Sequence, residues 1–151
     1  MKKITPFLWF DDNAEEAMNH YVSIFKDSEV TGLNRLPDGR VISGLFTLAG
    51  EEFMALNGGP QFKFTEAISL FVDCETQAEV DELWSKLLDG VGEEQQCGWL
   101  KDRYGLSWQI IPSVLMKYLS DPDPEKAGRV MQAMLQMRKI DIAALEAARA
   151  G

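Results

Sequence analysis

The chain has 151 residues, of which 46% are hydrophobic and 26% charged, proportions typical of one globular domain or of two half-domains sharing a core. Its 24 acidic and 15 basic residues give a formal net charge of −9, which disfavours a nucleic acid as partner because such binding depends on clustered Lys and Arg. No apolar run approaches the roughly 20 residues that span a bilayer, and Asp11 ends the first apolar run too early for a signal peptide, so we expect a cytoplasmic protein with no membrane partner.

The first half of the chain predicts a strand, a helix and three further strands. Residues 4–10 form the first strand, and apolar residues recur at helical spacing between residues 14 and 25. Asn13 precedes this helix and Glu16 stands three residues later, which predicts a capping box. The further strands, separated by turns that contain Gly39 and Gly50, are expected at 29–36, 40–48 and 53–57.

The second half repeats this order. Residues 68–72 predict a strand, Thr76 and Glu79 predict a second capping box, and Gly90 marks the end of the helix that follows. Three short strands are expected at 93–96, 98–101 and 107–111. A tight turn at Gly105 joins the last two of them.

The duplicated order resembles the vicinal oxygen chelate fold, which is the fold of the glyoxalase/bleomycin resistance/dioxygenase superfamily. Three segments carry the resemblance to its PhnB-like branch, whose members are often named demethylubiquinone methyltransferase-like: 4–10, 55–60 and the hairpin 97–112. The resemblance implies an α+β fold in which two βαβββ modules, about 4–58 and 66–112, form a curled mixed sheet within one domain of residues 1–112.

The remaining residues, 113–151, predict a C-terminal helical extension. Its helices are expected at 113–119, 124–137 and 140–150, with a break at the Asp-Pro pairs between the first two. Several methionines lie on the apolar side of the second helix, where adaptable packing is their usual role. We expect the extension to cap the barrel or to pack on a partner chain.

Alternate residues of a strand share a face, and this alternation predicts a partly polar pocket. One face is uniformly apolar and is expected to meet the helices: Leu8, Phe10, Ile68, Leu70, Val72, Trp108 and Ile110. The other face mixes polar and aromatic side chains, and Ser107, Gln109 and Ile111 share it. The predicted ligand-binding residues come from this second face: Phe7, Trp9, Met54, Ser69, Phe71 and Gln109.

Gln109 is placed at the centre because it is a polar residue inside an otherwise apolar strand. Such an amide either faces a cavity or finds a hydrogen-bond partner within the protein. The alternative is therefore that Gln109 only ties strands together.

The resemblance places four metal-ligand positions on outer strands, at Thr5, Met54, Ala67 and Gln109. The position of Gln109 is a glutamate in many relatives, and only Gln109 among the four has even a weak ligand atom. We therefore expect no metal and no other cofactor. Cys74 and Cys97 are too few and too far apart for a structural zinc site and are expected to be reduced, mostly buried thiols.

No catalytic residue is identified from the sequence. The single histidine, His20, lies off the apolar stripe of its helix and is expected to be a solvated surface residue. Asp102 and Arg103 stand at a turn tip, where we also expect solvated side chains.

The sequence thus favours a metal-independent small-molecule-binding protein. Two alternatives stay open: a glyoxalase/dioxygenase-type or methyl-transfer enzyme of the same superfamily, and a resistance-type protein that sequesters a cationic drug. We expect a homodimer, because small half-sheets leave strand edges and a sheet face to be covered.

Overall fold

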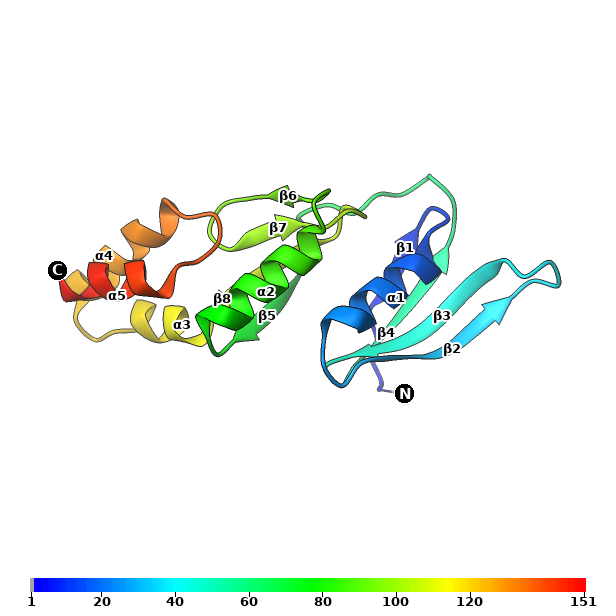
Figure 1. Ribbon diagram of the computed structural model, residues 1–151, viewed down its shortest axis with the longest axis horizontal. Coiled ribbons are helices and arrows are strands. Elements are labelled where there is room, and N and C mark those ends of the chain that lie inside the picture. Colours follow the sequence, from blue (N-terminus) through cyan, green and yellow to red (C-terminus); the bar gives the residue numbers. More distant parts are fainter. Residues whose placement is uncertain (1) are drawn as a thin grey trace. The chain divides into compact units, whose positions relative to one another are not determined.

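The computed structural model describes residues 2–151, which form two compact units, one ending at Phe64 and the other covering Thr65–Gly151 (Figure 1). The first unit contains β1 (Phe7–Phe10), α1 (Ala14–Ile24), β2 (Glu29–Arg35), β3 (Val41–Leu48) and β4 (Glu51–Asn57). The second begins with β5 (Ser69–Cys74), α2 (Gln77–Leu88), β6 (Glu93–Glu94), β7 (Trp99–Lys101) and β8 (Ser107–Pro112). It ends with α3 (Ser113–Leu119), α4 (Pro124–Leu135) and α5 (Ile142–Ala150). The predicted α+β fold with its duplicated βαβββ order is confirmed.

In the first unit, α1 covers one face of a four-stranded sheet with the order β1–β4–β3–β2. β1 pairs in parallel with β4, whereas the hairpins β2–β3 and β3–β4 are antiparallel. Gly44 in β3 lies beneath Met18 of α1, because a Cβ at Gly44 would come within 2.6 Å of Met18 Cε. A side chain at position 44 would therefore require the end of the Met18 side chain to move.

The second unit repeats this mixed sheet with the order β5–β8–β7–β6. β5 pairs in parallel with β8, and the other pairs are antiparallel. The apolar stripe of α2 is buried, and so are the β8 side chains on the helix side: Val80, Leu83, Trp84, Leu87, Trp108 and Ile110. Each sheet therefore has one face covered by its own helix.

The two helices that cover the sheets begin differently. Thr76 caps α2 as predicted, since its hydroxyl accepts a hydrogen bond of 3.1 Å from the backbone N–H of Glu79. The predicted cap at Asn13 is wrong, because that side chain makes no capping hydrogen bond. Instead, Asn57 at the end of β4 accepts the N–H of Ala14 at 2.8 Å and donates to the carbonyl of Val41 at 3.1 Å.

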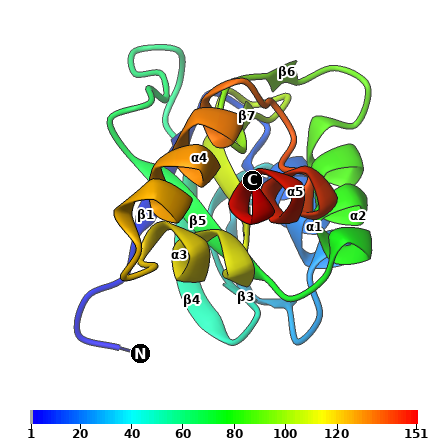
Figure 2. The same cartoon turned by 90° about the vertical axis from the view of Figure 1, so that its left-hand side faces the viewer.

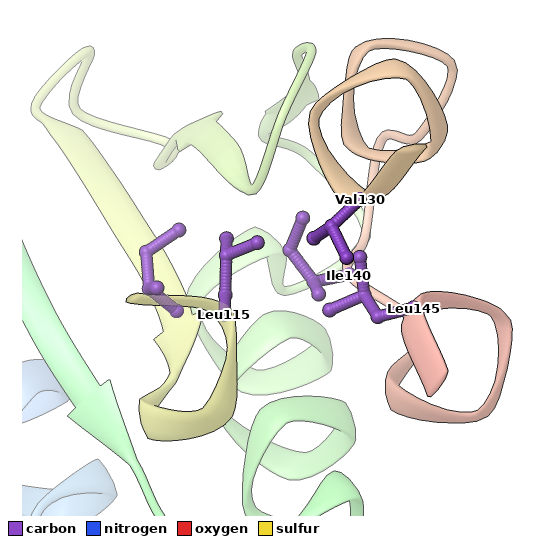
Figure 3. Close-up of a cluster of buried hydrophobic side chains, with 5 residues drawn as sticks. Leu115, Val130, Ile140 and Leu145 are labelled. Carbon is purple, nitrogen blue, oxygen red and sulfur yellow. The ribbon is translucent and has the colours of Figure 1, made fainter. Parts of the chain in front are cut away.

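The three C-terminal helices belong to the second unit, and Figure 2 shows them grouped together. They enclose a cluster of buried side chains that also includes Ile111 of β8: Leu115, Val130, Ile140 and Leu145 (Figure 3). Ile111 packs in this cluster, so the prediction that it lines a cavity together with Gln109 is wrong. The backbone N–H groups of Cys97 and Gly98 also donate to Met137 and Arg138, each at 2.8 Å.

A few predicted boundaries differ from the structure. β1 begins at Phe7 rather than at residue 4, and β6 has only two residues. Ile68 was expected to face a helix, but it precedes β5 and is 60% exposed, so that prediction is wrong. Across residues 2–151, no helix is both long and apolar enough to cross a membrane.

Candidate functional site

The candidate site residues lie on the sheet faces that α1 and α2 do not cover, here called the open faces. In the first unit, Phe7 of β1, Met54 of β4 and Leu45 of β3 are cross-strand partners in one row. Phe7 is 50% exposed, and Met54 and Leu45 are half-buried. This open face is therefore apolar and accessible.

Trp9 stands in the neighbouring row, and its polar atom is already used. Its indole Nε1 donates to the carbonyl of Gly59 at 2.9 Å, and its ring meets Phe62 edge-on at 4.9 Å between centroids. A Cβ at Gly58 would overlap the Trp9 ring. Trp9 thus anchors the segment after β4 and can offer a ligand only ring surface.

In the second unit, Gln109 of β8 lies between two aromatic partners, Phe71 of β5 and Trp99 of β7. Its Nε2 donates to Ser69 Oγ at 3.0 Å, which links β8 to β5. Phe71 is 51% exposed, and Gln109 and Trp99 are half-buried. The structure therefore brings Ser69, Phe71 and Gln109 together, as it brings together Phe7 and Met54 in the other unit.

Met54 and Gln109 occupy matching positions in the repeat. They follow the turn glycines Gly50 and Gly105 by the same number of residues, and each is paired with a phenylalanine of the parallel neighbour. The amide of Gln109 is thus the polar counterpart of a thioether. The second open face has the hydrogen-bonding capacity that the matching position of the first open face lacks.

The next row of the second open face contains Ser69, Ser107 and Lys101. Ser107 is 0% exposed, and its hydroxyl oxygen has no hydrogen-bond partner in the described chain. Lys101 Nζ forms an ion pair of 3.0 Å with Glu66, which lowers the pKa of that carboxyl. The sequence predicted the face on which Ser107 lies, but its burial depends on contacts that no pattern shows.

The four positions expected for metal ligands do not form a metal site. Thr5 precedes β1 and Ala67 lies in a turn before β5, so the expectation that both stand on strands is wrong. A hydroxyl, a thioether, a methyl and an amide also make a poor donor set. Among residues 2–151, no three His, Cys, Asp or Glu side chains lie close enough to hold a metal ion together.

Three surface hollows lie outside the six predicted site residues. One of about 580 Å³ lies between the start of α1 and the β2–β3 hairpin, and one of about 680 Å³ lies between α4 and α5. The third, of about 540 Å³, borders the candidate site because Glu66 and Trp99 line it. Its other lining residues are Glu93, Glu94, Gln95 and Gln96.

The charged groups of these hollows are largely paired already. Arg35 binds Glu15 at 2.8 Å, beside the first hollow. In the third, Glu66 is paired with Lys101, and Glu94 accepts the indole N–H of Trp84 at 2.8 Å. Arg35, Glu15, Glu66 and Glu94 are thus already engaged within the protein.

Asp102 is a structural residue, and the prediction of a solvated side chain is wrong. It is 3% exposed and accepts the backbone N–H groups of Tyr104 and Leu106 and the indole N–H of Trp108, at 2.8, 3.0 and 2.9 Å. It therefore fixes the β7–β8 turn. Its neighbour Arg103 is ion-paired with Asp89 at 3.1 Å.

The remaining nucleophilic and basic candidates are no better placed for catalysis. Burial raises the pKa of the Cys74 thiol to about 12, with Glu79 and Asp73 adding to the effect, so this thiol stays protonated. His20 is half-buried on α1 and its Nε2 is buried, so it is not the solvated residue that was expected. Neither side chain lies on an open face.

The comparisons with known proteins agree with this fold. The family model described as 3-demethylubiquinone-9 3-methyltransferase matches residues 2–111. A PhnB protein from Bacillus cereus is 40% identical, with a TM-score of 0.70 over 74% of this chain and 100% of its own. No curated protein matches.

More distant structures share the fold alone. Protein PA1353 from Pseudomonas aeruginosa is 19% identical, with a TM-score of 0.60 over 74% of this chain and 98% of its own. The fosfomycin resistance protein FosX from Listeria monocytogenes is 14% identical, with a TM-score of 0.56 over 80% of this chain and 98% of its own. The fold is the vicinal oxygen chelate fold with added C-terminal helices, and the chain belongs to the PhnB-like family of the glyoxalase/bleomycin resistance/dioxygenase superfamily.

Proposed function

We propose that this protein binds a small, flat organic molecule on the open face of its second unit, without a metal. The observation that carries the proposal is the row Phe71–Gln109–Trp99, in which one amide stands between two aromatic side chains. Aromatic surface with a few polar groups is the usual composition of a small-molecule site. Of the two polar atoms of the Gln109 amide, Nε2 has a hydrogen-bond partner within residues 2–151 and Oε1 does not. Oε1 is therefore available to a ligand.

The apolar open face of the first unit is proposed to be a ligand-contacting surface in its own right, through Phe7, Trp9 and Met54. Its side chains offer apolar contact area but little hydrogen bonding. We therefore assign the orientation of the ligand to Gln109 and Ser69.

The test is a screen of the full-length protein against neutral aromatic compounds, followed by calorimetry on wild type and Gln109→Leu. We expect the variant to lose binding while its free energy of unfolding falls by about 1 kcal/mol, the worth of one hydrogen bond. A variant that unfolds readily, or that binds unchanged, would make Gln109 a structural link between β8 and β5.

Metal independence has its own measurement. The motive is the poor donor set of Thr5, Met54, Ala67 and Gln109. We expect elemental analysis of the purified protein to find well under one transition metal per chain. A stoichiometric metal removed by Gln109→Leu would contradict this part of the proposal.

A second candidate is methyl transfer, which the description of the matching family favours. A Gly-rich turn that binds a nucleotide-like methyl donor normally leads from a strand into a helix. Here Gly58 and Gly59 follow β4, but residues 61–68 contain no helix. Saturable binding of S-adenosylmethionine by calorimetry would favour this candidate, and its absence would favour simple binding.

We further propose a homodimer. The exposed rings of Phe7 and Phe71 and the uncovered sheet faces present apolar surface that a second copy would remove from water. Light scattering should give a mass of about two chains at micromolar concentration. A monomer would overturn the proposal.

A further inference from the structure

On the second open face, one polar group is buried without a partner. Ser107 is fully buried and its hydroxyl makes no hydrogen bond with any of residues 2–151, although leaving such a buried group unpaired lowers stability. Ser107 points to the same face as Gln109, two residues further along β8. An unpaired hydroxyl at this place suits a polar atom that arrives with a ligand.

The groups around Ser107 are mainly hydrogen-bond donors. Ser69, its partner on β5, already accepts from Gln109 Nε2, so its own hydroxyl proton remains available for donation. Lys101, its partner on β7, carries an ammonium with three protons. Two hydroxyls and one ammonium in a single row favour an acceptor oxygen, and most of all an anionic one.

An ion pair spans the strand on which Ser107 lies. Lys101 belongs to β7 and Glu66 to the turn before β5, while β8 runs between β7 and β5. The 3.0 Å contact between Lys101 Nζ and Glu66 therefore crosses β8 beside Ser107. Glu66 is the present partner of Lys101, and its carboxylate makes no hydrogen bond with Ser107, so a ligand carboxylate would have to reach further toward β8 than Glu66 does.

Breaking this ion pair costs little free energy. The side chains of Glu66 and Lys101 are 53% and 28% exposed, and ion pairs of this kind contribute little to stability. Glu93, the partner of Lys101 on the other side, belongs to the edge strand β6. An incoming anion would therefore approach Lys101 from the β5 side.

We propose that the Lys101–Glu66 ion pair is a latch over Ser107, and that an aromatic carboxylate opens it by replacing Glu66 as the partner of Lys101. The ligand carboxylate would accept hydrogen bonds from Ser107 and Ser69, and its ring would lie against Phe71 or Trp99. This inference rests on the proposed small-molecule site and names the class of its ligand.

The experiment titrates the full-length protein with 2-naphthoate and follows binding by calorimetry. Glu66→Gln should tighten binding about three- to tenfold because the competing carboxylate is removed, whereas Lys101→Met should weaken it at least tenfold. Ser107→Ala should weaken binding about three- to tenfold without lowering the unfolding midpoint, since an unpaired hydroxyl is removed. Glu82→Gln, which breaks the surface ion pair with Lys86 on α2, is the matched control and should leave binding unchanged.

Two further probes separate charge from shape. The neutral 2-naphthol and the cationic 2-naphthylmethylamine should bind more weakly than 2-naphthoate. If either binds better, if the wild type does not bind 2-naphthoate, or if Glu66→Gln leaves its affinity unchanged, the latch is overturned.

Loss of a neutral ligand in Gln109→Leu together with unchanged affinity in Glu66→Gln would overturn the latch and leave the proposed function standing. Tighter binding in Glu66→Gln together with unchanged binding in Gln109→Leu would support the latch and remove Gln109 from the centre of the site.

Discussion

The backbone N–H of Ile142 donates a hydrogen bond of 2.7 Å to the side-chain Oε1 of Gln77, 65 residues earlier in the chain. The other end of the same amide, Nε2, donates to the carbonyl of Ile140 at 3.0 Å. The Gln77 side chain at the start of α2 thus forms hydrogen bonds with two backbone groups at the start of α5, the carbonyl of Ile140 and the N–H of Ile142. Lys139 adds an ion pair with Asp81 of α2 at 2.9 Å.

These contacts of Gln77 with Ile140 and Ile142, here called the clamp, predict that the C-terminal helices stabilise the second unit. Gln77→Ala should lower the free energy of unfolding by about 2 kcal/mol, because two backbone groups lose their partner. Urea denaturation followed by circular dichroism measures the effect. Gln132→Ala, on the exposed face of α4, is the control and should change stability by less than about 0.5 kcal/mol. Equal effects of the two variants would contradict the clamp.

A buried carboxylate at the β7–β8 turn gives the second prediction. In Asp102→Asn one oxygen becomes an NH₂ group, so either the indole of Trp108 or a backbone N–H then faces a donor instead of an acceptor. We expect Asp102→Asn to lower the free energy of unfolding by about 2–3 kcal/mol. A buried donor would be left unpaired, and a charge-assisted hydrogen bond would be lost.

Asp38→Asn, in the exposed β2–β3 turn, makes the same chemical change where both carboxylate oxygens face solvent-exposed partners. Its thermal midpoint should stay close to that of wild type. If Asp102→Asn were equally mild, the turn would not depend on the carboxylate.

Two glycines predict opposite outcomes for the same substitution. Gly44→Ala should destabilise by about 1–3 kcal/mol, because its methyl group would meet the buried end of Met18. Gly128→Ala should stabilise by up to about 1 kcal/mol, since this position is inside α4 with open space around it. Chemical denaturation of both variants tests the pair, and the same sign of change in both would contradict the packing argument.

The thiols should differ in reactivity. The pKa of Cys74 is raised to about 12, so its thiolate is almost absent in the native protein below that pH, and the side chain is 0% exposed. Cys97 is half-buried, between β6 and β7, and is therefore more accessible than Cys74. A disulfide reagent at pH 8 should therefore label one thiol per native chain and two after denaturation. Cys97→Ser should abolish the native signal, and a remaining native signal would show that Cys74 is accessible.

The sequence predicted most of the fold because its local signals agree with one another. The helical spacing in α1 and α2, the turn glycines and the capping residue Thr76 all indicate the same order of elements. At α1 the predicted cap at Asn13 makes no hydrogen bond, and the side chain that bonds the start of the helix is Asn57, which accepts the N–H of Ala14 from a distant part of the sequence. Local capping rules cannot include such a long-range contact.

The candidate site was predictable only as far as strand alternation reaches. Alternation placed Phe7, Met54, Ser69, Phe71 and Gln109 on open faces, and the polar residue within β8 drew attention to Gln109. It could not show that Ser107 is fully buried or that Asp102 is, because both depend on residues from other strands and turns. The ion pair of Lys101 with Glu66 joins residues with no shared local pattern, and no sequence rule indicates it.

The contact between Trp9 and Gly58 has a consequence for how the family varies. No side chain fits at position 58 while an indole occupies position 9, so the two positions can change only together. Homologues that carry alanine or serine at the position of Gly58 should carry a smaller residue at that of Trp9. They would thereby lose the indole hydrogen bond to the following glycine, and the segment between the two repeats would be released from the sheet it now lies against.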